Sequence, residues 1–106
     1  MAGSNPQQSG EQDADALREA LHGRAEYMER KFKVRRAHDI KPDYLQQTLD
    51  DIGSWSASPK LQRSDIVKAR GAEDLIYAAI TIYEEPDNRE AYFRKLRVIA
   101  DRLKRI

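Results

Sequence analysis

The residues best suited to metal chemistry lie in a predicted helix over residues 13–34. Glu19 and His22 form a Glu-x-x-His pair, and Glu26 follows one turn later on the same polar face. Glu-x-x-His is half of the ligand set of a carboxylate-bridged di-iron centre, which needs a second such pair and two further glutamates. The only other histidine, His38, lies in a predicted linker. The sequence therefore predicts no bound metal or other cofactor, and two surface histidines.

Nucleophilic catalysis has little support in the sequence. Ser54, His38 and Asp51 supply the residue types of a hydrolase triad, but Ser54 lacks the glycine pattern of a nucleophile elbow. The chain has no cysteine, which excludes a disulfide framework, a thiolate metal site and a thiol nucleophile. The missing cysteines also fit a reducing intracellular compartment. We expect that the protein is not an enzyme.

Basic side chains gather where the first predicted helix ends. Five of the seven residues 30–36 are basic, and they are Arg30, Lys31, Lys33, Arg35 and Arg36. Like charges this close repel one another. An acidic or phosphate-bearing partner would relieve this repulsion. Trp55, the only tryptophan, lies in a predicted loop, where it either packs over the core or meets a partner. Because tryptophan often anchors interfaces, the sequence predicts a partner-binding surface made of these five basic residues and Trp55.

Charge is layered along the chain although the total is only +1. Residues 24–41 carry seven Lys or Arg against three acids, residues 89–106 carry seven against two, and residues 73–87 carry five acids and no base. Two interpretations remain open. Either the charges suit the helix dipoles and pair between neighbouring helices, or the basic segments bind phosphate groups of a nucleic acid or a phosphorylated ligand.

The length of 106 residues suits one domain. Residues 1–12 are almost all polar or small, so we expect a flexible N-terminal tail. Residues 13–106 form the predicted domain. The N-terminal segment resembles neither a secretory signal nor a transit peptide. The longest apolar run, residues 75–80, is far too short to span a bilayer.

Apolar residues recur at spacings of three and four in four segments, and no useful strand pattern exists. The predicted helices begin at Asp13, at Pro42 and near Ser64 as an N-cap, and the fourth is capped by Asp87. Gly53 is the predicted stop of the second helix, and the third should be central and form an antiparallel hairpin with the fourth. The fold class is all-α, a four-helix tetratricopeptide-like superhelix or small bundle. Its predicted core is Leu21, Met28, Leu49, Leu75, Ile76, Ile80, Phe93, Leu96 and Leu103.

The order of features from residue 26 onward resembles subunit Va of mitochondrial cytochrome c oxidase. The similar segments are EYMERKF at 26–32, HDI at 38–40, the Leu45 to Leu49 face, SPK at 58–60, ARGAEDL at 69–75, AITIYE at 79–84 and the last helix from Tyr92 to Leu103. Where that family has two consecutive arginines, this chain has Arg70 followed by Gly71. The resemblance implies a helical superhelix and a peripheral, non-catalytic subunit on the matrix side of the mitochondrial inner membrane.

The function expected from the sequence is therefore that of a non-catalytic helical accessory subunit that binds larger protein partners. The resemblance implies that these partners belong to a respiratory oxidase complex. The alternative is a small regulatory protein that binds nucleic acid or a phosphorylated ligand through its basic segments. A third possibility is an inhibitor or chaperone that acts through one helix face. A helix-turn-helix around Gly71 is not expected, because the apolar spacing continues through it.

Overall fold

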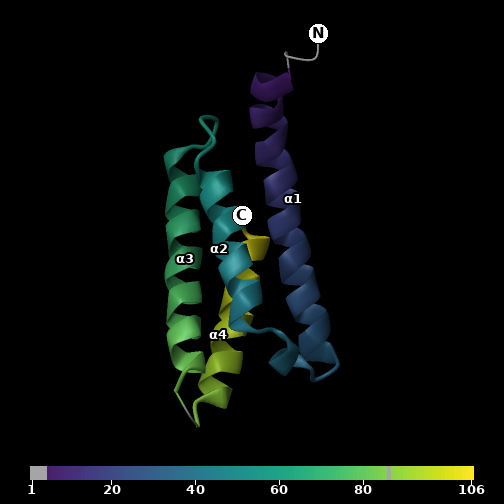
Figure 1. Ribbon diagram of the computed structural model, residues 1–106, viewed down its shortest axis with the longest axis vertical. Helices are drawn as coiled ribbons and strands as arrows, with labels where there is room; N and C mark the ends of the chain where they lie inside the picture. The colour runs from purple at the N-terminus through teal and green to yellow at the C-terminus, as the bar shows by residue number, and fades with distance from the viewer. Residues whose placement is uncertain (1–4, 86) are drawn as a thin grey trace.

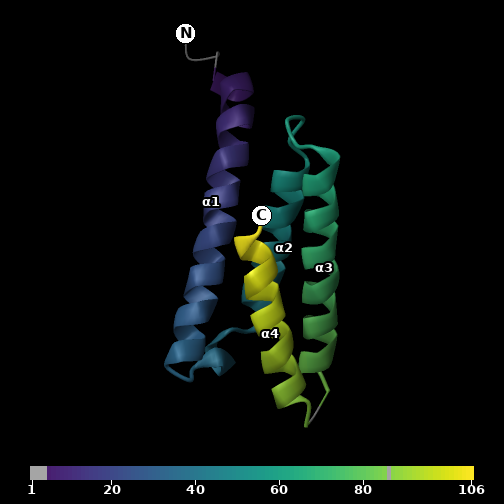
Figure 2. The same ribbon diagram turned by 180° about the vertical axis from the view of Figure 1, so that it is seen from behind.

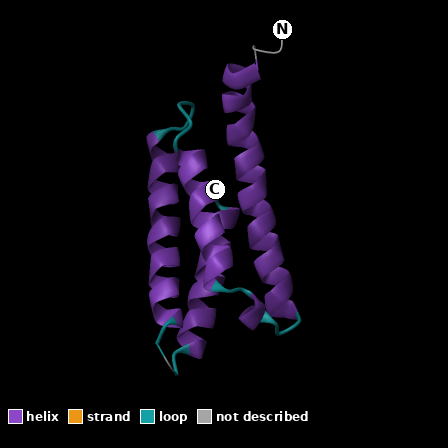
Figure 3. Cartoon of the chain, in the orientation of Figure 1, coloured by secondary structure: helices purple, strands orange, loops and turns teal. Residues whose placement is uncertain are grey.

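The computed structural model describes residues 5–85 and 87–106, with side chains for residues 14–85 and 87–106. It contains α1 (Asn5–Lys33), the short 3-10 helix η2 (Ala37–Asp39), α2 (Pro42–Ser56), α3 (Arg63–Tyr83) and α4 (Arg89–Lys104). None of the described residues belongs to a strand (Figure 3). The predicted all-α class with four main helices is confirmed.

Successive helices run in opposite directions along one long axis (Figure 1). Helix α1 contacts α2 and α4, and α3 contacts the same two helices, so the four form a closed ring. This is an up-and-down four-helix bundle, one of the two all-α arrangements that the sequence predicts. The predicted antiparallel hairpin of α3 and α4 is present. The expectation of a central α3 was wrong, because each helix has two neighbours.

The two ends of the bundle differ. The lower end in Figure 1 holds η2 and the connection between α3 and α4, and the upper end holds the loop of residues 57–62. Helix α4 has 16 residues and α3 has 21, a difference of about 8 Å at the usual helical rise. The C-terminus consequently lies well below the upper ends of α1, α2 and α3 in both views (Figures 1 and 2).

The core lies along the axis between the four helices and contains residues from each of them. Six of the predicted core residues are buried, and they are Leu21, Met28, Leu49, Ile76, Leu96 and Leu103. The other three, Leu75, Ile80 and Phe93, are half-buried and pack against that core. Helix α3 buries mainly alanines beside Ile76, so it approaches its neighbours along a narrower stripe than its sequence indicates.

Helix α2 is longer than predicted. Pro42 occupies its first turn as expected, but the helix continues through Gly53 and ends at Ser56. Trp55 is therefore helical, and the expectation that it lies in a loop was wrong. Its position three residues after Ile52 continues the stripe of Leu45 and Leu49, which explains why the indole enters the core.

Two helix starts also differ from the prediction. The N-cap of α3 is Gln62 instead of Ser64, and the Asp65 carboxylate accepts a hydrogen bond from the Gln62 backbone N–H at 3.1 Å. The N-cap of α4 is Asn88 instead of Asp87. Asp87 has a φ of 69°, and this left-handed conformation serves the chain reversal before α4 instead of the cap.

Helix α1 begins at Asn5, before the predicted start at Asp13. Extending an existing helix costs much less than nucleating one, which accounts for the longer helix. Residues 1–4 of the predicted tail and the side chains of residues 5–13 lie outside the described part of the chain.

Candidate partner-binding site

The partner-binding surface predicted from the sequence does not assemble. Helices α1 and α2 are antiparallel (Figure 1). Trp55 at the end of α2 therefore lies beside Arg18 in the first half of α1. The basic segment of residues 30–36 is at the opposite end of the bundle. Trp55 is also fully buried, with 0% of its surface exposed. The prediction of Trp55 as an exposed anchor beside the arginines was wrong, and its core position on α2 is the physical reason.

The basic end of α1 is partly neutralised within the chain. The Asp39 carboxylate of η2 accepts hydrogen bonds from Arg36 Nε and Lys31 Nζ, both at 2.9 Å. Arg30, Lys33 and Arg35 are exposed and pair with no carboxylate among residues 14–85 and 87–106. Asp39 thus relieves part of the repulsion among the basic side chains of residues 30–36. That repulsion was the reason to expect an acidic partner.

A tight turn sets the direction of these basic side chains. Arg36 N–H donates to the Lys31 carbonyl at 2.8 Å, and Arg35 N–H donates to the Phe32 carbonyl at 3.1 Å. Arg35 has a φ of 59°. This is the geometry of a helix C-cap in which glycine usually takes the left-handed position. The turn leads directly into η2 and brings Asp39 back to Lys31.

The Asp39 contacts predict an acid-sensitive contribution to stability. Hydrogen bonds from Arg36 and then Lys31 hold the pKa of Asp39 well below its usual range. The contribution is complete above the unfolded pKa of about 3.9 and is lost as pH falls towards the folded pKa. Asp39→Asn should therefore lower the Tm at pH 7. The difference in Tm between this variant and the wild type should become smaller below about pH 4. The control is Asp50→Asn at an exposed position. If the Tm difference between Asp39→Asn and the wild type were as large at pH 3 as at pH 7, the stabilising role of the Asp39 carboxylate would be contradicted.

A cleft of about 620 Å³ opens at the lower end of the bundle. Its aromatic lining comes from Tyr83 at the end of α3 and from Tyr92 and Phe93 at the start of α4. The Tyr83 and Tyr92 rings pack edge to face, with 4.9 Å between their centroids. Tyr92 is buried, but Tyr83 keeps 44% of its surface exposed. The cleft therefore presents one accessible aromatic ring supported by a buried one.

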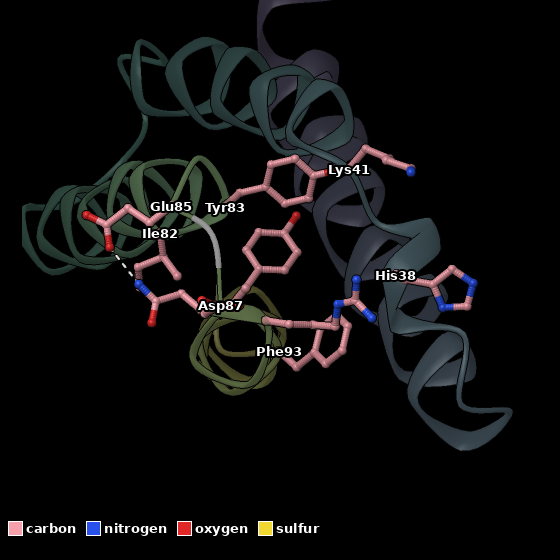
Figure 4. A pocket seen from close by; sticks show the side chains of 10 residues that line it. His38, Lys41, Ile82, Tyr83, Glu85, Asp87 and Phe93 are labelled. Atoms are coloured by element: carbon pink, nitrogen blue, oxygen red, sulfur yellow. Dashed lines mark hydrogen bonds between the residues drawn. The ribbon is translucent and has the colours of Figure 1, made fainter.

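One hydrogen bond joins the two sides of this cleft. The buried Tyr92 hydroxyl donates to the Ile40 carbonyl at 2.6 Å, linking α4 to the connection between η2 and α2. Burial raises the pKa of Tyr92, so the hydroxyl keeps its proton at neutral pH. The bond holds the η2–α2 connection against α4. His38 and Lys41 of this region lie at one side of the cleft, while Phe93 and Tyr83 lie at the other (Figure 4).

The rim of the cleft carries both signs of charge. Lys41 and Arg89 are exposed cations, His38 is an exposed histidine, and Glu85 and Asp87 are exposed acids. Glu85 accepts a hydrogen bond from the Asn88 side-chain amide at 2.6 Å, which holds the turn between α3 and α4 (Figure 4). Tyrosine and arginine, which both line this cleft, are enriched at protein interfaces and their hot spots.

The residues considered for metal and triad chemistry do not come together. Glu19 and Glu26 are exposed. The prediction of two surface histidines holds for His38 but was wrong for His22, which is half-buried with its Nε2 covered. Asp51 is engaged by Arg24 at 2.8 Å, and Ser54 lies at the end of α2 opposite to His38. Within the described part of the chain, no three His, Cys, Asp or Glu residues are grouped so that they could hold a metal ion. None of the described helices is long and apolar enough to cross a bilayer.

Comparisons with protein-family models, with curated proteins and with solved structures each gave no match. The resemblance to cytochrome c oxidase subunit Va accordingly remains a hypothesis, and the function is argued from the geometry of the cleft.

Proposed function

We propose that this chain is a non-catalytic helical protein that docks on a larger protein through the lower-end cleft. The single observation that carries the proposal is the exposed ring of Tyr83. It packs edge to face against the buried Tyr92 ring, with 4.9 Å between the ring centroids. An exposed ring with a rigid support loses little side-chain entropy when a partner covers it.

The charges around the cleft support a protein partner with mixed polarity. Lys41 and Arg89 can pair with acids of a partner, and Glu85 and Asp87 can pair with its bases. A polar rim around an apolar floor is the usual anatomy of a non-obligate interface. A peripheral place in a respiratory oxidase is the specific form of this function that the sequence resemblance implies, and it belongs to the same proposal.

A second candidate rests on Arg30, Lys33 and Arg35, three exposed cations near the end of α1 without a carboxylate partner among the described residues. Such a group could bind phosphate groups of a nucleic acid or a phosphorylated ligand. Phosphate binding weakens steeply as salt rises, whereas docking on the aromatic cleft depends mainly on buried apolar surface. Salt titration of the captured complex separates the two functions.

The test compares two variants that change the same residue types at different places. A partner is identified by capture from a lysate with the tagged protein and then purified. Tyr83→Ala with Arg89→Glu should weaken its binding about tenfold or more, which is about 1.4 kcal/mol. The matched control is Tyr77→Ala with Arg70→Glu on the exposed face of α3, and it should bind as wild type does.

A single substitution guards against an effect on folding. Arg89 is the first residue of α4, where a glutamate suits the helix dipole, so Arg89→Glu should leave the Tm unchanged and still weaken binding. Equal affinity of wild type and the cleft double variant would refute the proposed site. Loss of binding only in Arg30→Glu with Lys33→Glu would favour the second candidate.

A further inference from the structure

A second cleft, of about 290 Å³, lies at the upper end of the bundle and is independent of the docking cleft. Arg18 of α1, Trp55 of α2 and both Gln62 and Asp65 at the start of α3 line it. It is found where α4 has already ended, so three helices surround a region that the fourth does not reach (Figures 1 and 2).

Two residues that line this cleft carry hydrogen-bond donors without an acceptor among the described residues. Arg18 Nε and Trp55 Nε1 are both buried, and neither has a hydrogen-bond partner in the described part of the chain. Trp55 as a whole is 0% exposed. A buried N–H without an acceptor is costly, and two of them in one small cleft point to an acceptor that binds both.

The charge of the cleft restricts what that acceptor can be. Arg18 carries a guanidinium that lies over the Trp55 ring, 5.7 Å from its centroid, and it makes no ion pair with any described residue. The N-terminus of α3 reaches the cleft through Gln62 and adds a positive dipole end. Asp15, Lys60 and Asp65 also line the cleft. The two carboxylates would oppose a dianion more strongly than a monoanion.

We propose that this cleft binds a carboxylate, whose two oxygens accept from Arg18 Nε and Trp55 Nε1. A carboxylate is a monoanion with two acceptors in one plane, which matches the two donors and the Arg18 guanidinium. Both nitrogens are covered, so the ligand enters as the flexible Arg18 side chain moves on the indole. The carboxylate could belong to a small organic acid or to the C-terminus of a peptide chain.

The only tryptophan gives one indole N–H signal, which makes the test direct. ¹⁵N-labelled protein is titrated with acetate, with sodium chloride at equal ionic strength, and with a short peptide that has either a free or an amidated C-terminus. We expect a saturable downfield shift of the indole proton with acetate and with the free-acid peptide, and none with chloride or the amide. Tenfold tighter binding of the free-acid peptide than of acetate would place the ligand at a chain end, and equal affinity would indicate a small acid.

A variant shows that Arg18 takes part. Arg18→Met keeps the apolar stem that covers the indole, so the fold should persist, and it should weaken the carboxylate response at least tenfold. The proposal is overturned if no carboxylate shifts the wild-type indole signal saturably. It is also overturned if chloride gives the same shift, or if Arg18→Met titrates as wild type does, since a water molecule would then suffice for the two donors.

Discussion

Trp55→Ala should lower the free energy of unfolding by about 3–5 kcal/mol, as expected for truncation of a buried tryptophan. Trp55 is fully buried at the last turn of α2, in the stripe that Leu45 and Ile52 begin. Few other large side chains could fill the space at this end, because α4 ends short of it. The bundle is expected to have a total stability of about 5–15 kcal/mol, so the variant should lose a large share of it.

Urea denaturation followed by circular dichroism measures this effect without using the tryptophan as the probe. Trp55→Phe should lose less stability than Trp55→Ala, because the ring retains part of the packing. The control is Val67→Ala on the exposed face of α3, where 64% of the valine surface is accessible, and it should change stability by less than about 0.5 kcal/mol. A Trp55→Ala cost as small as that of the control would mean that Trp55 is a surface residue after all.

Ile76→Ala should lower the free energy of unfolding by about 2–5 kcal/mol. Ile76 is fully buried and is the largest buried side chain of α3, whose other buried residues are Ala69, Ala72 and Ala79. Small neighbours on the same helix leave nothing to fill the cavity, so collapse around it should be limited.

The adjacent Leu75 is the matched control for Ile76. Leu75→Ala and Ile76→Ala remove the same number of side-chain carbons. Leu75, however, is only half-buried at the edge of the core. Its cost should therefore be clearly smaller, and urea midpoints of the two variants at equal m-values would measure the difference. If Leu75→Ala cost as much as Ile76→Ala, the helix would be rotated from the orientation described.

The helices themselves could be predicted because an apolar period of three to four residues follows directly from core packing. Their ends were less predictable. Gly53 suggests a stop, yet the helix continues because Trp55 is buried at the next point of the stripe. The spacing from Ile52 to Trp55 was visible in the sequence, and extending the stripe by one turn would have placed the indole in the core.

The docking cleft could not be predicted, because its lining comes from two stretches, residues 38–41 and 82–93, that lie far apart in the sequence. Lys41 precedes α2, Tyr83 ends α3 and Tyr92 begins the last helix. They meet only because the ring of helices closes and Tyr92 bonds to the Ile40 carbonyl. Aromatic residues at helical spacing indicate a core, and nothing in the spacing alone shows that Tyr83 would remain 44% exposed.

Hydrogen exchange of the complex with the captured partner tests the docking proposal most directly. Amide protection caused by the partner should be concentrated in residues 82–93 and 38–41, the segments that line the cleft. Residues 66–77, which include exposed Val67 and Tyr77 on α3, should exchange as in the free protein. Protection centred on residues 66–77, or on residues 30–36 with none at 82–93, would contradict the assignment of the lower-end cleft as the docking site.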